Sequence, residues 1–564
     1  MRRWCEVAER VSATTRTSQK TALLAEYLRS LPAADLPIAC TFFAGRPFPE
    51  SDPRAAGLGW ASVAAAVAEL TAADPADLGA AYDRWSDLGR AVEDLLAARG
   101  HAPDPGMAPS LVDVEAAFGA IEAASGPAAK AHVFRDLVAR CDPLTARYVV
   151  KILTGELRIG LREGLLEAAI AAAFDRPLAD VKRASQLTGE VGATAALARE
   201  DRLGGASLML FRPLKCMLAA PVEDADEAIR RLGPTVWVED KYDGIRAQLH
   251  RAGDEVRLYS RDLHDVTEQF PEIAEGAREL SWDGALDGEI LAYRDGTVLP
   301  FLQLQARLGR KRPSAVIREE VPVIYVAFDL LATGARGGPV LAELDRPLRE
   351  RRERLEALGL PLVGEGGVFA LSHLGSADSA AGLEDEFAAA RARRNEGLMV
   401  KDPESPYLPG RRGFGWLKMK KALATLDCVV VGVELGHGKR HGVLSDYTFA
   451  VRDDATGGLV TIGKAYSGLT DAELAELGRW FEAHTLRQLG RYRLVEPAVV
   501  VEVAFDVLMR STRHRSGFAL RFPRIVRVRD DKTAADVDTL ATVEAIHRGL
   551  QAGAEHLVTA SARR

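Results

Sequence analysis

The first part of the chain carries apolar residues at helical spacing. Trp4, Val7 and Val11 stand three or four positions apart, which places their side chains on one face of a helix. The pattern recurs beyond them and is interrupted by segments rich in Pro and Gly, such as residues 101–106. We therefore predict an all-α domain over residues 1–205.

A different pattern begins after residue 205. Short runs rich in β-branched and aromatic residues, such as 235–238 and 323–328, predict strands. A helical pattern over 346–358 lies among them. Mixed strands and helices predict an α+β domain over residues 206–420.

Short strand-like runs with Gly-rich joints continue to the end of the chain. Residues 428–433 and 499–505 are examples, and such a series predicts a small β-barrel over residues 421–564. Between these runs, Thr470 and Glu473 have the spacing of a capping box. They predict that a helix begins there.

Bulk composition excludes several classes of protein. Apolar residues make up 47% and charged residues 27%, which is ordinary for a folded, water-soluble chain. The net charge of -7 argues against a protein that coats nucleic acid by charge alone, so any such contact must use local basic surfaces. The five cysteines are scattered without a Cys-x-x-Cys pair, which argues against a disulfide framework or a Cys-rich zinc site.

The sequence predicts neither a secretory signal nor a membrane anchor. Glu6, Glu9 and Arg10 interrupt the apolar start of the chain. The most apolar run, residues 165–174, is too short for a membrane span. We therefore expect a cytoplasmic protein with no membrane partner.

The candidate chemistry centres on a Lys-x-Asp-Gly motif at residues 241–244, directly after an apolar strand. Alone this motif is weak, because a surface lysine before an Asp-Gly turn has the same letters. Further motifs follow in order: Ser260-Arg261, Leu286-Asp287-Gly288-Glu289, Ala327-Phe328-Asp329, Glu396-Gly397-Leu398-Met399-Val400-Lys401, Trp416-Leu417-Lys418-Met419-Lys420 and Arg529-Asp530-Asp531-Lys532. Their order, spacing and strand context together resemble the covalent nucleotidyltransferase superfamily of ligases and capping enzymes.

Two more segments narrow the resemblance. Residues 147–161 look like the DNA-binding domain of the large ATP-dependent DNA ligases of archaea and eukaryotes, and residues 211–219 resemble the entry into their adenylation domain. Capping enzymes and RNA ligases do not carry that helical domain. The resemblance implies an adenylation domain over 206–420, an OB-fold over 421–564, and a monomer that joins nicked duplex DNA with ATP.

In such an enzyme the lysine of the first motif attacks the α-phosphate of ATP. A nucleophilic lysine must lose its proton, and neighbouring cations favour the neutral amine. The resemblance makes Lys241 this nucleophile. The phosphoryl oxygens also require positive charge; the resemblance assigns it to Lys418, Lys420, Arg246, Arg261 and Arg412.

The resemblance also implies contacts to base, ribose and metal. Phe328 would stack on adenine and Glu239 would read the purine edge. Glu289 would bind ribose or metal and Glu396 metal, with Mg²⁺ or Mn²⁺ equally suited to oxygen ligands. The ordinary alternatives are a core aromatic for Phe328, solvated surface carboxylates, and for Arg412 a phosphate-binding loop residue without ATP contact.

The C-terminal barrel is implied to move during the reaction. Arg529, Asp531 and Lys532 would first act over the pyrophosphate, and the barrel would then turn another face toward DNA. The hinge is expected within residues 420–427.

The helical region supplies candidate phosphate contacts. Arg147, Lys151, Arg158 and Arg162 carry positive charge within one segment of it, and each is either a phosphate contact or a structural residue.

The sequence disfavours other classes of protein. An RNA ligase or a GTP-using capping enzyme is disfavoured by the helical domain. A non-catalytic DNA-binding scaffold is disfavoured by the intact motifs around Lys241. An NAD-dependent ligase is disfavoured because the sequence has no four-Cys zinc module.

Overall fold

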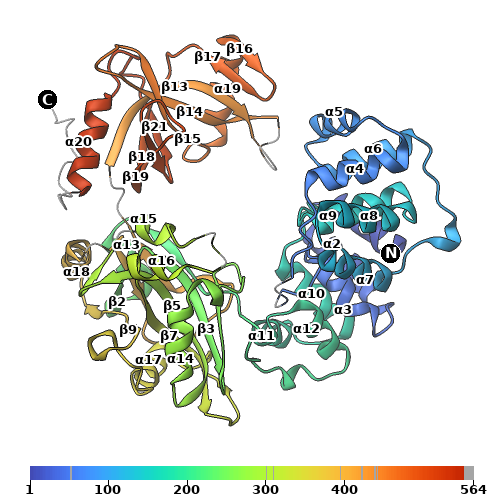
Figure 1. The fold of residues 1–564 in the computed structure, drawn as a ribbon, viewed down its shortest axis with the longest axis horizontal. Helices are drawn as coiled ribbons and strands as arrows, with labels where there is room; N and C mark the ends of the chain where they lie inside the picture. Colours follow the sequence, from blue (N-terminus) through green and yellow to red (C-terminus); the bar gives the residue numbers. More distant parts are fainter. Residues whose placement is uncertain are drawn as a thin grey trace. The chain divides into compact units, whose positions relative to one another are not determined.

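The structure is a computed structural model that describes residues 1–551, except residues 51, 53, 300, 309, 311, 394, 421–423, 437–439 and 441. The chain divides into two units, Met1–Met419 and Lys420–Arg564, and each is considered by itself (Figure 1). The predicted hinge at residues 420–427 includes residues 421–423, which lie outside the described part.

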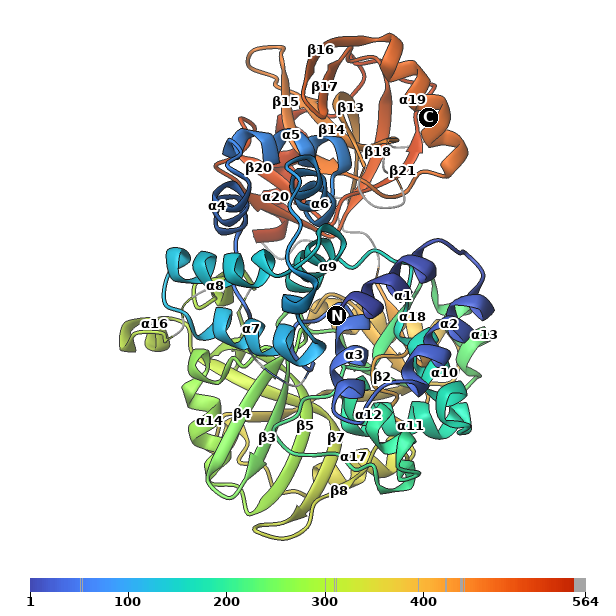
Figure 2. The same cartoon turned by 90° about the vertical axis from the view of Figure 1, so that its right-hand side faces the viewer.

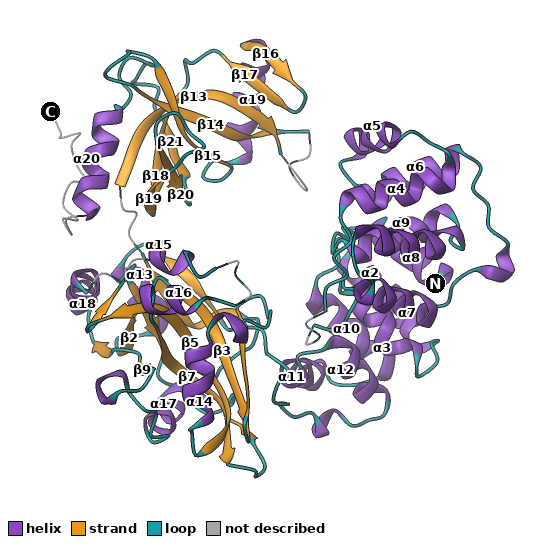
Figure 3. Ribbon diagram, in the orientation of Figure 1, coloured by secondary structure: helices purple, strands orange, loops and turns teal. Residues whose placement is uncertain are grey.

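The N-terminal region of the first unit is built from helices alone among the described residues (Figure 3). Trp4 is at its centre, stacked on Phe43 with ring centroids 4.4 Å apart and edge-on to Phe42 and Tyr148. These rings belong to helices far apart in sequence, so aromatic packing holds the region together. The helices are α1 (Arg2–Ser12), α2 (Thr17–Arg29), α3 (Asp35–Phe43), α4 (Trp60–Thr71), α5 (Pro75–Trp85), α6 (Leu88–Ala98), α7 (Leu111–Ala123), α8 (Pro127–Ala139), α9 (Pro143–Leu153), α10 (Glu163–Phe174), α11 (Leu178–Thr188) and α12 (Val191–Arg199).

The rest of the first unit contains two sheets with helices. One sheet has the strand order β1-β12-β11-β2-β10, and the other has the path β4-β3-β5-β7-β8, with β6 paired to β5 and β9 to β7. The strands are β1 (Leu218–Val222), β2 (Val236–Asp240), β3 (Ile245–Ala252), β4 (Glu255–Ser260), β5 (Trp282–Arg294), β6 (Thr297–Val298), β7 (Val323–Ala335), β8 (Leu341–Ala342), β9 (Phe369–Leu371), β10 (Leu374–Ala377), β11 (Leu398–Lys401) and β12 (Arg412–Met419).

Among the apolar clusters of this region, three pack the sheets against helices and against each other. The helices α13 (Ala225–Leu232) and α18 (Ala380–Ala392) cover the first sheet, and α14 (Pro271–Arg278) and α17 (Leu348–Glu356) contribute to the core of the second. Figure 2 shows the strands of the second sheet next to one another. The third cluster joins the sheets to each other and includes Trp416 from β12 and Leu331 from β7. The short helices α15 (Phe301–Gln305) and α16 (Ala315–Glu320) lie between β6 and β7 in the chain.

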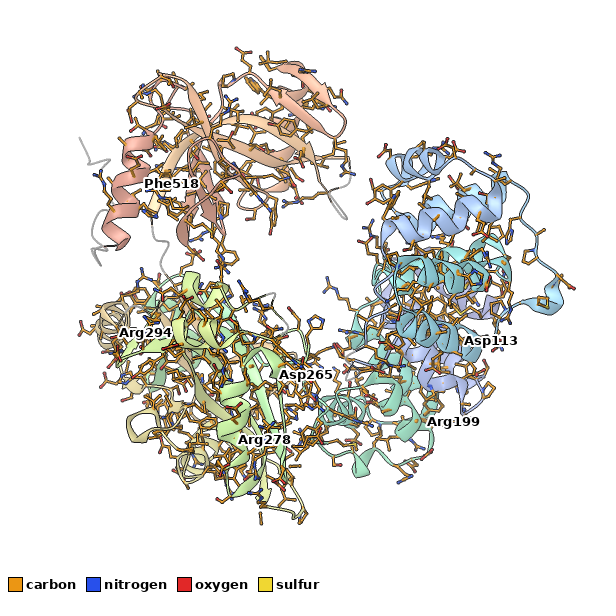
Figure 4. All side chains as sticks on the ribbon, in the orientation of Figure 1. Asp113, Arg199, Asp265, Arg278, Arg294 and Phe518 are labelled. Carbon is orange, nitrogen blue, oxygen red and sulfur yellow. The ribbon has the colours of Figure 1, made fainter. Side chains whose placement is uncertain are left out.

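The second unit is rich in strands. Its longest strand, β13, pairs along one edge with β14 and along the other with both β17 and β18. Phe518, labelled in Figure 4, is buried in its core with the imidazole of His547 5.2 Å away. The elements are β13 (Ala424–Leu435), β14 (Leu444–Arg452), β15 (Leu459–Ala465), α19 (Asp471–Ala483), β16 (Thr485–Leu489), β17 (Tyr492–Val495), β18 (Val500–Phe505), β19 (Val507–Arg510), β20 (Phe518–Arg521), β21 (Arg524–Val528) and α20 (Leu540–Gln551).

The predicted fold class is confirmed: helices first, then an α+β domain, then a strand-rich domain. The predicted capping box is also present, since Thr470 Oγ1 accepts from the Glu473 backbone N–H while the Glu473 carboxylate accepts from the Thr470 N–H. Within the described residues, no helix has the length and apolar character needed to cross a membrane.

Candidate active site

Lys241 directly follows β2, and the β2–β11 ladder continues past it. Its backbone N–H donates to Gly397 O at 2.8 Å, and its carbonyl accepts from Glu396 N at 2.9 Å. The Nζ atom of Lys241 donates to the Glu396 carboxylate, and both side chains are about four-fifths shielded from solvent. The structure thus joins the predicted nucleophile to a predicted metal ligand 155 positions later in the chain.

Gly244 and Gly397 stand at positions of the motifs where no other residue fits. A Cβ on Gly244 would lie 2.4 Å from the carbonyl oxygen of Ile290, and one on Gly397 would lie 2.3 Å from that of Met419. Neither distance is possible for a real side chain, and Gly397 also has a φ of +147°. Only glycine lets the backbone before β3 approach β5 and the backbone before β11 approach β12 so closely.

Strand alternation divides the first sheet into an apolar and a polar face. Val238, Val400 and Leu417 belong to the apolar cluster under α13 and α18. The pairs Glu239↔Met399 and Met399↔Lys418 form one row across the three strands, and Trp237↔Lys401 and Lys401↔Trp416 form the next. Because side chains alternate along a strand, these two rows share the face opposite the apolar cluster. Glu239 and Lys418 are therefore on one face, as the prediction requires.

Phe328 lies beside this face. Along β5 and β7 the register passes from Asp287↔Asp329 to Gly288↔Ala327, so Phe328 is the extra residue of a β-bulge. Its ring meets Trp416 edge-on at 6.2 Å, and it is partly buried. A bulge directs a side chain out of the regular strand pattern, which leaves Phe328 both a packing role and a partly accessible ring.

Arg246 is held by a carboxylate that the prediction did not assign. Its guanidinium donates to both oxygens of Asp287, at 3.1 and 2.6 Å, and to Met217 O at 2.8 Å. The hydroxyl of Tyr407 donates to the same carboxylate at 2.6 Å. The Asp287 side chain is 0% exposed, and its two hydrogen bonds fix the orientation of the Arg246 guanidinium.

Removing this carboxylate is expected to destabilise the first unit. In Asp287→Ala the Arg246 charge and the Tyr407 hydroxyl lose their buried partner, a change that costs roughly 3 kcal/mol or more. Urea unfolding of the full chain, followed by tryptophan fluorescence, should show the unfolding transition of the first unit at lower denaturant. Asp287→Asn, which keeps an acceptor, should show a smaller shift, and a transition unchanged in Asp287→Ala would contradict this account.

Glu289 lies on β5 and is partly buried. Burial raises the pKa of its carboxyl to about 8, and the charges of Asp287 and Glu396 add to the increase while Lys241 and Arg246 oppose it. A nearby cation would stabilise the ionised form of such a carboxyl group. Among the described residues no three His, Cys, Asp or Glu side chains form a metal cluster. Two carboxylates nevertheless fit Mg²⁺, which usually binds one or two of them and completes its shell with water and phosphate oxygens.

The remaining predicted cations lie at different places. Arg412 is exposed at the start of β12, where it donates to Ala219 O at 3.2 Å. Arg261 is exposed in the turn after β4. Lys420 belongs to the second unit, and its Nζ lies 3.6 Å from the Asp506 carboxylate. The structure thus brings Lys418 to the polar face, and gives Lys420 a partner in the C-terminal unit.

Arg529, Asp531 and Lys532 form one cluster in the second unit. The Arg529 guanidinium bonds both Asp531 oxygens, at 2.8 and 2.7 Å, and both Asp427 oxygens at 2.9 Å. The Lys532 ammonium also donates to Asp427. Hydrogen bonding by Arg529 lowers the pKa of Asp531 below its usual range. Asp427, which sequence reasoning did not select, collects both cations.

The structure distinguishes between the two alternatives left open for the cations of the helical region. Arg147 is buried between Glu9, at 3.1 Å, and Glu93, at 3.3 Å, and Lys151 is buried against Asp87. These two cations are structural, because their partners on neighbouring helices neutralise them. The other two residues of the predicted set, Arg158 and Arg162, are exposed.

An exposed aromatic residue in the second unit was also missed. Phe522 is 57% exposed and has a φ of +55°, with the Arg521 guanidinium 4.9 Å from its ring centroid. A non-glycine residue in this conformation stores strain, and an exposed ring among arginines is typical of nucleic-acid surfaces. The signal in the sequence is the cluster Arg521-Phe522-Pro523-Arg524.

Curated relatives match the chain over nearly all its length. A probable DNA ligase of Koribacter versatilis is 47% identical over 562 residues, 96% of each chain. A DNA ligase of Methanothermobacter thermautotrophicus is 34% identical over 557 residues, 97% of each chain. A probable DNA ligase of Opitutus terrae is 44% identical over 629 residues, and there the chain spans only 61% of the relative's length.

A solved structure named "Pmar-Lig_Pre." has a TM-score of 0.61 and 15% identity, and the match covers 93% of this chain and 99% of that one. At this identity the likeness concerns the fold alone. Three family models also match: DNA ligase N terminus over residues 1–171, ATP dependent DNA ligase domain over 216–420, and ATP dependent DNA ligase C terminal region over 440–532. The chain therefore belongs to the family of ATP-dependent DNA ligases.

Proposed function

We propose that this chain seals nicks in duplex DNA through an AMP bound covalently to Lys241. The observation that carries the proposal is the position of Lys241, which leaves the end of β2 beside the Glu396 carboxylate and next to the strand face with Glu239 and Lys418. A lysine amine next to a proton acceptor and a set of cations is the arrangement that nucleophilic attack on a phosphate requires.

The reaction consists of three phosphoryl transfers. Lys241 gives up a proton, for which Glu396 is the hydrogen-bonded acceptor. Its Nζ then forms a bond to the α-phosphorus of ATP as the bond from that phosphorus to pyrophosphate breaks. The 5′-phosphate of the nick next displaces Lys241 and takes the AMP. Finally the 3′-hydroxyl attacks the 5′-phosphorus, loses its proton, and releases AMP.

We assign the parts of this work to the predicted site residues. Phe328 stacks on the adenine and Glu239 accepts a hydrogen bond from its edge. Lys418 and Lys420, with Arg246, Arg261 and Arg412, balance the charge of the phosphates and orient them. Glu289 and Glu396 would hold Mg²⁺ or Mn²⁺, which when bound neutralises charge on the phosphoryl oxygens.

The C-terminal cluster acts on the first step. Arg529 and Lys532 are the cations of the second unit that we assign to the leaving pyrophosphate, with Asp531 orienting Arg529. Both cations are paired with Asp427 in this structure, and they would have to leave that carboxylate in order to bind the phosphates.

Loss of this cluster should impair self-adenylation selectively. In Asp531→Ala and Lys532→Ala, transfer of label from ATP should fall by about tenfold or more, while sealing of a pre-adenylated nick should change far less. Arg527→Ala is the matched control, because Arg527 is an exposed cation on β21, directly before the cluster, and pairs with Glu502 instead. Equal losses in the two assays would remove the assignment to pyrophosphate.

The partner is nicked double-stranded DNA. We assign Phe522 and its neighbouring arginines to the DNA-facing surface of the second unit, and Arg158 and Arg162 to that of the helical region. We further propose that the chain acts as a monomer in the cytoplasm. Its domain boundaries are proposed at residues 205/206 and 420/421.

The test is incubation with α-labelled ATP, followed by denaturing electrophoresis and peptide mapping. A label that survives denaturation and maps to the peptide of Lys241 supports the proposal, and the same reaction with α-labelled GTP separates a ligase from a capping enzyme. An unlabelled protein, or a label on another lysine, would contradict it.

A further inference from the structure

The polar face of the first sheet contains a buried ion pair that the phosphate chemistry does not use. The Lys401 Nζ donates to Glu239 Oε2 at 2.8 Å, and the two side chains are 1% and 4% exposed. They come from β11 and β2, which are adjacent strands. Burial of either charge alone would be costly, so each side chain depends on the other as its partner. Because a buried ion pair adds little to stability, the pair suggests a role in the site.

Aromatic rings enclose the lysine. Its Nζ lies 4.2 Å from the ring centroid of Trp416 and 5.0 Å from that of Phe328. Trp416 is itself 1% exposed. Lys401 therefore cannot turn to solvent, and its positive charge stays next to the carboxylate of Glu239 whatever binds at the accessible side of Phe328.

The second oxygen of Glu239 has a different environment. Among the hydrogen bonds of the described residues, the side-chain contact of Glu239 is the one from Lys401 to Oε2. Oε1 is left to accept from a ligand. An ionised carboxylate can only accept, whereas a protonated carboxyl group can also donate.

This difference determines which purine fits. At the edge that Glu239 would face, adenine presents an amine that donates, and guanine presents a carbonyl that accepts. An ionised Glu239 therefore binds adenine and repels guanine, while a protonated Glu239 tolerates both. Selectivity between the bases then depends on whether the carboxyl group stays ionised.

We propose that Lys401 is a positioning residue that gives the nucleotide site its selectivity for adenine over guanine, by holding Glu239 as an ionised acceptor. The inference rests on the proposed function only in taking Glu239 to face the purine edge. Lys401 itself does not touch the reacting atoms.

Other charged groups around the pair do not replace Lys401. Lys418 shares the strand face, and the buried hydrogen bond to Glu239 Oε2 comes from Lys401. Arg246 lies over the rings of Phe328 and Trp416, at 5.4 and 5.8 Å, and is paired with Asp287. Burial raises the pKa of Tyr242, and the charges of Asp240 and Glu239 add to that effect, so Tyr242 stays neutral.

The experiment compares self-nucleotidylation of full-length Lys401→Met with α-labelled ATP and GTP, each from about pH 6 to about pH 8.5. The parent protein should prefer ATP by the same ratio throughout. In the variant that ratio should fall by about tenfold or more, because the Glu239 carboxylate loses the buried cation that fixes it as an acceptor. A ratio equal to the parent's at every pH would overturn the proposal.

Two further variants keep the test decisive if Lys401→Met folds poorly. Glu239→Gln presents an amide that can donate to guanine, so its ATP preference should fall at every pH; full retention would overturn the proposal. Arg393→Met is the matched control, because Arg393 pairs with the adjacent carboxylate of Asp240 at 2.7 and 2.9 Å and should leave the ratio unchanged.

Failure of the proposed function gives a different result. A parent protein that takes no label from ATP would reject the ligase chemistry itself. A parent that is labelled, together with a Lys401→Met variant whose KM for ATP rises while GTP stays unused at all pH values, would instead make Lys401 a direct base contact and overturn the positioning role.

Discussion

Lys241→Ala is expected to reduce label transfer from α-labelled ATP by at least about a thousandfold while leaving affinity for nicked duplex nearly unchanged. The amine of Lys241 forms the covalent bond, and alanine has no nucleophilic group to replace it. Its direct partner is Glu396, so the variant removes one hydrogen bond and leaves the rest of the fold intact. Denaturing electrophoresis measures the label, and a gel shift at low salt measures the affinity.

A nick that already carries AMP separates the covalent step from the others. Lys241→Ala should seal such a nick at a measurable rate, because AMP is already on the DNA. Lys241→Arg, which keeps the positive charge, should also fail to take label, since the guanidinium does not lose its proton at neutral pH. Label retained by either variant would reject Lys241 as the nucleophile.

The fold was predictable because periodicity reports local structure. Helical spacing around Trp4, the β-branched run over residues 323–328 and the Thr470 capping box each mark an element that the structure contains. Lys241 and Gly244 could also be identified from the sequence alone, because the motif that contains them is a short continuous segment.

The interaction partners of the site residues were much harder to predict from the sequence. Asp287 stands within one of the motifs, but its contact with Arg246 depends on the pairing of β3 with β5, which no local pattern specifies. Arg147 shows the same limit in the opposite direction. Its charge indicated DNA contact, whereas Glu9 on α1 and Glu93 on α6 neutralise it in the folded chain. Charge is visible in a sequence, and burial with a distant partner is not.

Deletion of residues 1–205 is expected to spare self-adenylation and to reduce nick sealing by about a hundredfold or more. The first step uses Lys241 and the motifs after residue 205, whereas sealing requires a grip on the duplex. The segment that follows the deletion keeps its own support, because Gln248 accepts from Leu214 N at 3.0 Å and Tyr407 accepts from Met217 N at 3.0 Å. Labelling with ATP and sealing of a nicked substrate are measured on the same preparations.

Point variants show whether the loss comes from phosphate contacts. Arg162 is exposed, so Arg162→Ala should lower the slope of log affinity against log salt by about 0.9, the value for one phosphate contact, and should keep the thermal stability of the parent. Arg147→Ala is the matched variant on a buried cation, and it should lower the stability while the salt slope of the folded protein stays the same. The deletion should reduce the slope further than Arg162→Ala, because it removes every phosphate contact of the helical domain. Full sealing by the shortened protein with the parent's salt slope would show that this domain does not hold the DNA.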